Sequence, residues 1–245
     1  MPDRILLLGA SSGIGAALAL ALARPGRSLA LVARRAAELD AVAARARQQG
    51  ATVHTEVLDC GDTDAAPAAW ARIEAALGPL DTVVYCAGVM PDVARDEYAT
   101  DKDLAMVRTN LAGAIAWCNL AATAFQARGR GTICGIGSVA GDRGRQPSPV
   151  YGATKAALHA YLESLAGRLW ARGVVVVTIK PGPVRTPMTA GRGPLPLLVD
   201  AEVAAARIVR ALERGERVVY VAPAWRLIMA VIRALPWPLF KRFAK

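Results

Sequence analysis

Ile5-Leu6-Leu7-Leu8-Gly9-Ala10-Ser11-Ser12-Gly13-Ile14-Gly15 is the stretch of this 245-residue chain that decides its fold. The apolar run Ile5–Leu8 is typical of a strand buried on both faces of a parallel sheet. The glycines after it let the backbone approach a ligand, and the helical pattern that follows offers free N–H groups and a positive dipole end. This order predicts a turn that binds a pyrophosphate. The residues expected to contact it are Gly9, Ser11, Ser12, Gly13, Ile14 and Gly15.

The same turn also reads Gly9-x-Ser11-x-Gly13, a pattern that surrounds the nucleophile of serine hydrolases. In those enzymes the serine lies well inside the sheet, and an acid and a histidine follow it in the chain. Here the turn follows the first strand, and only two histidines are present. We expect His54 to lie on a strand face, and His159 to pack, to be solvated or to border the site. The hydrolase interpretation is therefore disfavoured.

Strand and helix patterns alternate along the chain, which predicts a parallel sheet covered by helices on both faces. A chain of 245 residues can form one domain with a full core. We therefore predict an α/β fold: a single doubly wound domain with a parallel sheet of about seven strands over residues 1–223, and a tail over residues 224–245. Strands are expected near residues 4–8, 28–33, 52–58, 80–86, 131–137, 173–180 and 217–221, and helices near 14–24, 36–49, 63–77, 101–127, 151–172 and 201–214.

Four polar residues carry the chemistry that the sequence suggests. Tyr151 and Lys155 stand four apart at the start of a helical pattern, so they share one helix face. A nearby ammonium favours the phenolate and lowers the phenol pKa from its ordinary value of about 10. Ser138 ends an apolar strand pattern, at the sheet edge where ligands bind in open α/β sheets. Asn110 lies inside a helical pattern, where its amide competes with the backbone, so we expect another group to hold it there.

Taken in chain order, the glycine turn, Asn110, Ser138, Tyr151 and Lys155 resemble the short-chain dehydrogenase/reductase family, as an NADP(H)-type member. The resemblance covers residues 5 to about 221 and implies a Rossmann-type fold, a nicotinamide cofactor and no metal. It also implies further cofactor contacts: Asp59 at the adenine, Ala87 and Gly88 in the turn after the fourth strand, and Pro181, Gly182, Val184 and Thr186 in a loop that covers the nicotinamide.

The chain departs from the family pattern at two places. The family usually has Thr where this chain has Leu8, and Asn-Asn where it has Tyr85-Cys86. Both positions support hydrogen bonds around the cofactor. We expect the departures to weaken cofactor binding slightly and to leave the chemistry intact.

Cofactor choice can be predicted from the end of the second strand. An acid there would bind the adenosine ribose hydroxyls and repel a 2′-phosphate. This chain has Ala33 at that place, followed by Arg34 and Arg35. A guanidinium matches a phosphate bidentately. The sequence therefore predicts NADP(H) over NAD(H), with Arg34 as the first contact and Arg35 as the second. The alternative is that both are solvated residues at a helix start.

The resemblance implies a mechanism for reversible transfer of a hydride between the nicotinamide and a carbonyl or secondary alcohol. Tyr151 would be the general acid, and Ser138 would polarise the same substrate oxygen. Lys155 would lower the pKa of the phenol and bind the nicotinamide ribose. Asn110 would hold a water that links Lys155 to solvent. A cofactor-binding regulator without turnover is the non-enzymatic alternative.

Composition excludes some classes of protein. The net charge is +10, but most of the 30 basic residues are Arg scattered over the whole chain, and no nucleic-acid motif is present. We therefore predict no nucleic-acid partner. The four cysteines have no paired spacing, which favours buried reduced thiols in a cytoplasmic protein. The first strand begins almost at once, so no signal peptide is expected.

The segments 142–150 and 188–199 are expected to border the substrate pocket. The second is apolar apart from Arg192, as in a mobile lid over a hydrophobic substrate or in an ordinary connection. The tail 224–245 has five basic residues, no acid, two Trp and two Phe. It is too short, and too interrupted by Pro236 and Pro238, to span a bilayer.

The tail has two interpretations. It packs on its own fold, a partner subunit or the pocket, or it docks peripherally on a membrane, as basic amphipathic segments do. The second would make the protein a membrane-associated reductase of a lipid-linked keto substrate. The helices near 101–127 and 151–172 match those that pair subunits in the family, so we expect a homodimer or homotetramer.

Overall fold

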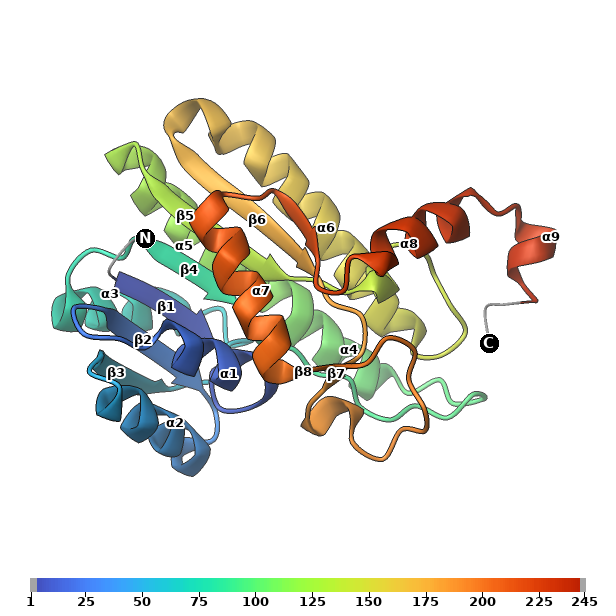
Figure 1. The fold of residues 1–245 in the computed structure, drawn as a ribbon, viewed down its shortest axis with the longest axis horizontal. Helices are drawn as coiled ribbons and strands as arrows, with labels where there is room; N and C mark the ends of the chain where they lie inside the picture. The colour runs from blue at the N-terminus through green and yellow to red at the C-terminus, as the bar shows by residue number, and fades with distance from the viewer. Residues whose placement is uncertain (1–3, 243–245) are drawn as a thin grey trace.

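The structure is a computed structural model that describes residues 4–242. Seven strands form one sheet: β1 (Arg4–Leu8), β2 (Ser28–Ala33), β3 (Thr52–Val57), β4 (Thr82–Tyr85), β5 (Gly131–Ile136), β6 (Val174–Lys180) and β9 (Val218–Tyr220). All pairs are parallel, in the order β3-β2-β1-β4-β5-β6-β9, which confirms the predicted doubly wound α/β fold (Figure 1). The chain order reverses at β1. In open sheets a ligand crevice lies beyond the strand ends at this point.

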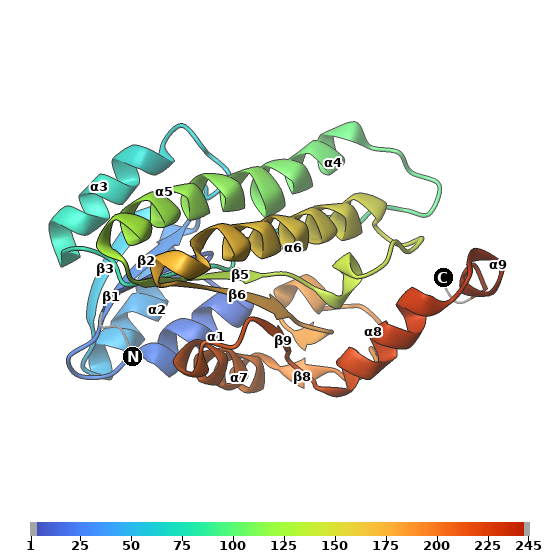
Figure 2. The ribbon, with the colours of Figure 1, turned by 90° about the horizontal axis from the view of Figure 1, so that it is seen from above.

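Helices cover both faces of the sheet (Figure 2). One layer contains α1 (Gly13–Leu22), α2 (Ala36–Gln48) and α7 (Ala201–Arg214), and the other α3 (Ala66–Leu77), α5 (Gly113–Arg128) and α6 (Pro149–Leu169). Strand β1 shows how the sequence produces two cores. Ile5 and Leu7 pack in the first, and Leu6 and Leu8 pack in the second. All four are fully buried, so the strand has no solvent face that would require a polar residue.

The helix predicted over 101–127 has an interruption that the sequence pattern did not reveal. It consists of α4 (Thr100–Val107), a π-helical segment (Arg108–Ala112) and α5. Such π-helical insertions are rare and occur frequently at functional sites. Asn110 lies in the middle of this one and is fully buried.

The C-terminal third adds elements that were not predicted as such. Two short strands, β7 (Val184–Arg185) and β8 (Val199–Asp200), pair in parallel outside the main sheet. After β9 the tail forms α8 (Ala224–Ala234) and α9 (Trp237–Phe240). The first of these ends before Pro236, because a residue that precedes proline disfavours the helical conformation. Lys245 and the rest of 243–245 lie outside the described residues.

Candidate active site

Two adjoining cavities lie beyond the carboxyl ends of the central strands. The cofactor crevice brings together twelve predicted residues: Gly9, Ser11, Ser12, Gly13, Ile14, Gly15, Arg34, Arg35, Asp59, Ala87, Gly88 and Thr186. The reaction cavity, of ≈ 270 Å³, brings together Ser138, Tyr151, Lys155, Pro181, Gly182 and Val184, and shares Ile14, Gly88 and Thr186 with the crevice. Asn110 lines neither cavity and lies behind their shared wall.

The glycines of the first turn are required by close backbone packing. Gly9 has a φ of +87°, and a Cβ added there would lie 2.6 Å from the Cα of Ala87. A Cβ on Gly15 would lie 2.1 Å from the carbonyl oxygen of Gly9. The start of α1 can therefore approach the ends of β1 and β4. Ser12, at the N-cap, makes no side-chain capping bond within the described chain, which leaves N–H groups at the helix start for an anion.

Charged side chains close the far end of the cofactor crevice. The Nη1 of Arg34 lies 3.5 Å from an Oδ2 oxygen of Asp59. The Nη2 of Arg35 donates to the hydroxyls of Ser11 at 3.0 Å and Ser12 at 2.7 Å. Both guanidiniums therefore face the crevice beside the glycine turn. This donor set, together with the glycine cradle, fits the phosphates of a dinucleotide.

Tyr85, one of the two departures from the family pattern, connects β4 to the π-helical segment. Its hydroxyl donates to the carbonyl of Thr109 at 2.6 Å, and the side chain is 1 % exposed. Burial raises its pKa well above 10, so the phenol stays protonated as a donor. A Cβ on Gly113 would lie 2.4 Å from this hydroxyl. The phenol of Tyr85 thus stabilises the π-helical segment next to the site.

Asn110 uses its amide to hold the wall between the two cavities. Its Oδ1 accepts the N–H of Val89 at 2.7 Å. Its Nδ2 donates to the carbonyl of Val89 at 3.0 Å and to the Thr154 hydroxyl at 3.3 Å. These contacts explain how a buried asparagine is accommodated inside a helix. They also join the π-helical segment to α6, one residue before Lys155.

Tyr151 and Lys155 lie in the first turns of α6 and face the reaction cavity. The Nζ of Lys155 donates to the carbonyl of Ile136 at 2.8 Å and lies 5.8 Å from the centroid of the Tyr151 ring. The prediction that Lys155 lowers the phenol pKa is wrong for this structure. Burial raises the pKa of Tyr151, against the opposing effects of the Ser138 hydrogen bond and of Arg145 and Arg192.

Burial acts on Lys155 in the opposite sense and lowers its pKa from 10.5 to about 8. Low polarity around both groups disfavours the charged form of each. At neutral pH the phenol of Tyr151 is therefore protonated. That is the state in which it can donate a proton.

Ser138 follows β5 in an extended conformation that places its hydroxyl in the reaction cavity. Its Oγ accepts the N–H of Ala140 at 3.1 Å, which leaves its own proton available to a partner in the cavity. Its backbone N–H is bonded to the Nε2 of His159 at 3.3 Å. A hydroxyl and a phenol thus converge on one point, where a substrate oxygen would receive both a hydrogen bond and a proton.

The two predicted pocket segments do border the reaction cavity. Arg145 comes from the first, and Arg192 from the second. Arg192 also reaches across the opening to Asp92, with its Nη2 3.2 Å from a carboxylate oxygen. The remaining lining is largely apolar and includes Met90, Val139, Met188, Leu195, Pro196 and Trp225.

Sequence reasoning missed three residues that shape the site. They are Trp225 on the cavity wall, Thr154 beside Asn110, and the Tyr85 hydroxyl. Trp225 lies in the tail, for which packing over the pocket was one of the predicted alternatives, but the residue itself was not singled out. A Cβ on Gly182 would lie 2.0 Å from its Nε1, so the tail packs directly on the Pro-Gly loop. The spacing of residues in the sequence carries no signal for these long-range contacts.

The competing hydrolase interpretation finds no support in the contacts of Ser11. Its hydroxyl accepts from Arg35, whereas His54 lies on β3 beside Glu56 and His159 lies beside Ser138. All four cysteines are free, as predicted, and burial raises the pKa of Cys60, Cys86 and Cys118 to about 12. Between residues 4 and 242 no group of three or more metal-ligating side chains comes together.

Known proteins are similar to this chain in sequence. The family profile described as short chain dehydrogenase matches residues 3–194. An uncharacterized oxidoreductase of Streptomyces coelicolor is 36% identical over 242 residues, which cover 98% of this chain and 96% of the relative. An uncharacterized oxidoreductase of Mycobacterium tuberculosis strain H37Rv is also 36% identical over 242 residues, covering 98% and 97% of the two chains.

A solved structure agrees over the whole length. The short-chain type dehydrogenase/reductase from Mycobacterium ulcerans superposes with a TM-score of 0.83 at 25% identity, and the match covers 99% of this chain and 97% of the other.

Proposed function

This chain belongs to the short-chain dehydrogenase/reductase family, and from that premise we propose that it is an NADPH-dependent reductase of hydrophobic carbonyl compounds, acting reversibly. As a family oxidoreductase it acts on alcohol or carbonyl groups with NAD(P)(H). The observation that carries the proposal is the convergence of Ser138, Tyr151 and Lys155 on one cavity that adjoins the glycine turn. We place the reaction in the cytoplasm.

Each of the four polar residues has its own role in the reaction. Bound NADPH supplies the hydride that reduces the carbonyl carbon. Tyr151 donates its phenolic proton to the oxygen, and Ser138 donates a hydrogen bond to it. Lys155 binds the nicotinamide ribose as a cation. Asn110 keeps the wall behind Lys155 in place and holds the water that connects this lysine to solvent.

The preference for NADPH rests on charge at the end of β2. No carboxylate follows Ala33 that would repel a 2′-phosphate, and two guanidiniums face the crevice there. Arg34 is the first contact and Arg35 the second.

The cavity lining supports an apolar substrate that carries an anionic end. Its walls are largely apolar, whereas Arg145 and Arg192 are the charged groups at its edge. Both lower the pKa of Tyr151, so their positive potential reaches the reacting centre. Pro-Gly and lid residues close the remaining sides: Pro181, Gly182, Val184, Thr186, Met188 and Leu195.

The test is NADPH consumption against a carbonyl panel, with Tyr151→Phe in parallel. The panel runs from small ketones and aldehydes to long-chain carbonyls, each with and without a terminal carboxylate. Removing the general acid should lower kcat by about 10²–10⁴-fold while NADPH still binds. A variant that keeps more than about a tenth of wild-type kcat would show that another group is the acid. NADPH binding with no turnover of any carbonyl would instead indicate a cofactor-binding regulator.

A second candidate is a reductase of a lipid-linked keto substrate that acts at a membrane surface. The observation that favours it is the outer face of α8 and α9, where Leu227 is 72 %, Val231 55 % and Trp237 65 % exposed. The inner face packs on the fold through Trp225 and Met229. Among residues 4–242 no helix is both long and apolar enough to cross a bilayer.

We further propose that residues 1–223 form the catalytic domain and that 224–245 is a tail docked on it. Arg143 donates to the carbonyls at the end of α8, at 2.6 Å for Leu235, and its guanidinium lies 3.9 Å from the Phe240 ring centroid. The protein is expected to form a homodimer or homotetramer through α5 and α6, which light scattering would measure.

A further inference from the structure

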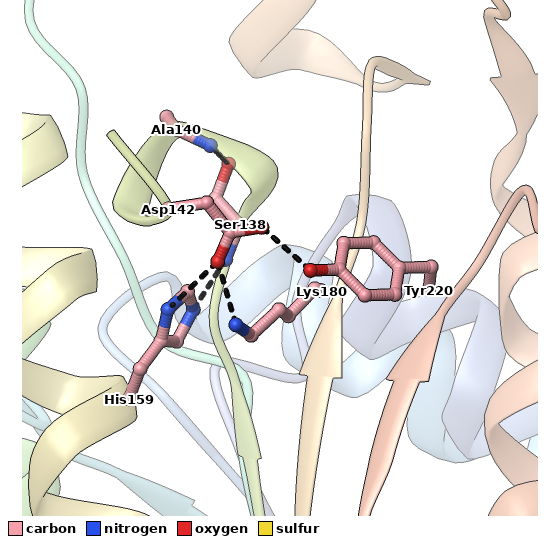
Figure 3. A network of polar contacts seen from close by, with 6 residues as sticks. All are labelled: Ser138, Ala140, Asp142, His159, Lys180 and Tyr220. Atoms are coloured by element: carbon pink, nitrogen blue, oxygen red, sulfur yellow. Dashed lines mark hydrogen bonds and ion pairs between the residues drawn. The ribbon is translucent and has the colours of Figure 1, made fainter. Parts of the chain in front are cut away.

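The turn that carries Ser138 is folded around the imidazole of His159 (Figure 3). A Cβ on Gly137 would lie 2.2 Å from the His159 Nε2, and a Cβ on Gly141 would lie 2.8 Å from its Cε1. Both glycines of this turn are therefore needed for the ring to fit. The ring projects from α6, one turn after Lys155. Its side chain is 11 % exposed.

The contact between His159 and Ser138 determines the protonation of the ring. The backbone N–H of Ser138 donates to the Nε2 at 3.3 Å, so that nitrogen carries no proton. Burial, followed by the nearby charge of Lys180, lowers the pKa of His159 to about 4. At neutral pH the ring is therefore neutral, with its proton on Nδ1. That nitrogen faces the carboxylate of Asp142 at 3.6 Å.

Asp142 is itself held by two further side chains. Its side chain is only 2 % exposed. One carboxylate oxygen accepts from the Nζ of Lys180 at 2.6 Å, and the other from the hydroxyl of Tyr220 at 2.7 Å. A buried carboxylate with these two donors has a fixed orientation, which in turn fixes the ring that it faces.

The network joins the elements that must meet for catalysis. Lys180 ends β6, directly before the Pro-Gly loop, and Tyr220 ends β9. The N–H of Val139 donates to the carbonyl of Pro181 at 2.9 Å, which connects the Ser138 turn to that loop a second time. Displacing any member would shift the serine relative to Tyr151 on α6.

We propose that His159, oriented by Asp142, is a positioning residue that holds the backbone of Ser138 so that its hydroxyl meets the substrate oxygen. This inference deepens the proposed function and rests on it. It assigns to His159 no proton transfer. The imidazole acts only as a hydrogen-bond acceptor. By accepting the backbone N–H of Ser138 it limits how far the reactive hydroxyl can move.

The experiment compares His159→Gln with His159→Leu. The Gln side chain can place an acceptor where Nε2 lies, whereas Leu fills the space without one. We expect His159→Leu to lower kcat by about 10- to 100-fold, with the Kd of NADPH unchanged, and His159→Gln to restore most of it. His54→Leu, at the chain's other histidine and away from the cavities, is the matched control and should keep wild-type kcat.

A second readout does not depend on turnover. Hydrogen exchange at the Ser138 amide should be slow in the wild type and in His159→Gln, and fast in His159→Leu. Asp142→Asn provides a second route, since it removes the charge that orients the ring, and should lower kcat in the same way without changing NADPH affinity.

Wild-type kcat in His159→Leu, or a Ser138 amide that remains protected there, would overturn the inference. An equal loss of kcat in the Gln and Leu variants would also overturn it. The volume of the side chain, and not its hydrogen-bond acceptor, would then be what matters. If the wild type reduces no carbonyl, the proposed function fails, and the exchange comparison still decides whether His159 holds Ser138.

Discussion

Arg34 and Arg35 face the cofactor crevice with different partners. Arg34 lies beside Asp59, whereas Arg35 is bonded to two serine hydroxyls of the glycine turn. Among the described residues the Arg34 guanidinium has only Asp59 as a partner, at 3.5 Å, so a 2′-phosphate would give it a closer, bidentate partner. For this reason we propose Arg34 as the first contact.

Arg34→Ala should therefore reduce the ratio of kcat/KM for NADPH to that for NADH by about tenfold or more, since charged hydrogen bonds contribute roughly 1.5–3 kcal/mol. Arg35→Ala should have the smaller effect. Steady-state kinetics with both cofactors measure it, and Arg24→Ala, at an exposed arginine outside the crevice, is the control. An unchanged ratio in both variants would mean that another group reads the phosphate.

The loss of a proton from Lys155 should limit NADPH binding at alkaline pH. Its pKa is about 8, so the ammonium that we propose binds the ribose is present below that pH and lost above it. We expect NADPH affinity and kcat/KM to fall as pH rises through about 8. Titration of NADPH binding against pH measures this. In Lys155→Met the affinity should be low at every pH, and a step near pH 8 that survives there would belong to another group.

The lowered pKa of Lys155 acts on stability in the opposite sense to its effect on NADPH affinity. The folded state binds fewer protons than the unfolded chain between pH 8 and 10.5, because burial lowers the pKa of this lysine. The contribution of Lys155 to the free energy of unfolding therefore rises with pH across that window. Loss of affinity above pH 8 is thus not a symptom of unfolding caused by this residue.

At the scale of elements, the π-helical segment between α4 and α5 is held from β4. The Tyr85 hydroxyl bonds the Thr109 carbonyl, one residue before Asn110, inside a fully buried contact. Helix periodicity alone favours a regular helix across these residues. The segment departs from a regular helix where a side chain from another element donates a hydrogen bond to a buried carbonyl.

Tyr85→Phe should lower the free energy of unfolding by about 1–3 kcal/mol, because a buried carbonyl loses its donor. It should also lower kcat by several-fold through the displaced Asn110. Chemical denaturation and steady-state kinetics measure the two effects. Tyr98→Phe, at a tyrosine that is 93 % exposed, is the control and should change stability by less than about 0.5 kcal/mol. Equal stability of both variants would contradict this account of the π-helical segment.

At the scale of the whole molecule, the tail links the site to one outer surface. Trp225 lines the reaction cavity, whereas Leu227 and Val231 on the same helix face outward. Arg226 and Arg233 supply positive charge on that helix, and α8 contains no acid. A surface of this kind suits an anionic bilayer, to which each basic residue contributes roughly 1 kcal/mol.

If the tail docks on membranes, the protein should co-sediment with vesicles of phosphatidylglycerol and phosphatidylcholine, and less with phosphatidylcholine alone. Val231→Asp should reduce that binding several-fold. Val203→Asp is a matched control, because both valines are 55 % exposed and Val203 lies on α7. Binding that is unchanged in Val231→Asp would exclude this face. Dissociation of an oligomer by Val231→Asp, without vesicle binding, would make it a subunit contact instead.

Much of the fold follows from local pattern. All seven strands of the main sheet were predicted within two residues of their bounds, because unbroken apolar runs and glycine turns are properties of neighbouring residues. Helix bounds were less accurate: α3 begins at Ala66, where 63 was predicted, next to a proline at its first turn. The tail was recognised as amphipathic, but its two helices were not separated.

The sequence by itself determined the parallel sheet, the glycine turn, the place of Ser138 at the end of a strand and the shared helix face of Tyr151 and Lys155, because these depend on periodicity and spacing. Only the tertiary structure decided their electrostatics. Burial, which no spacing reveals, raises the pKa of Tyr151 and lowers that of Lys155. It also decided that His159 lies inside the Ser138 turn and that Asp142 meets Lys180, since these contacts join residues 21 and 38 positions apart.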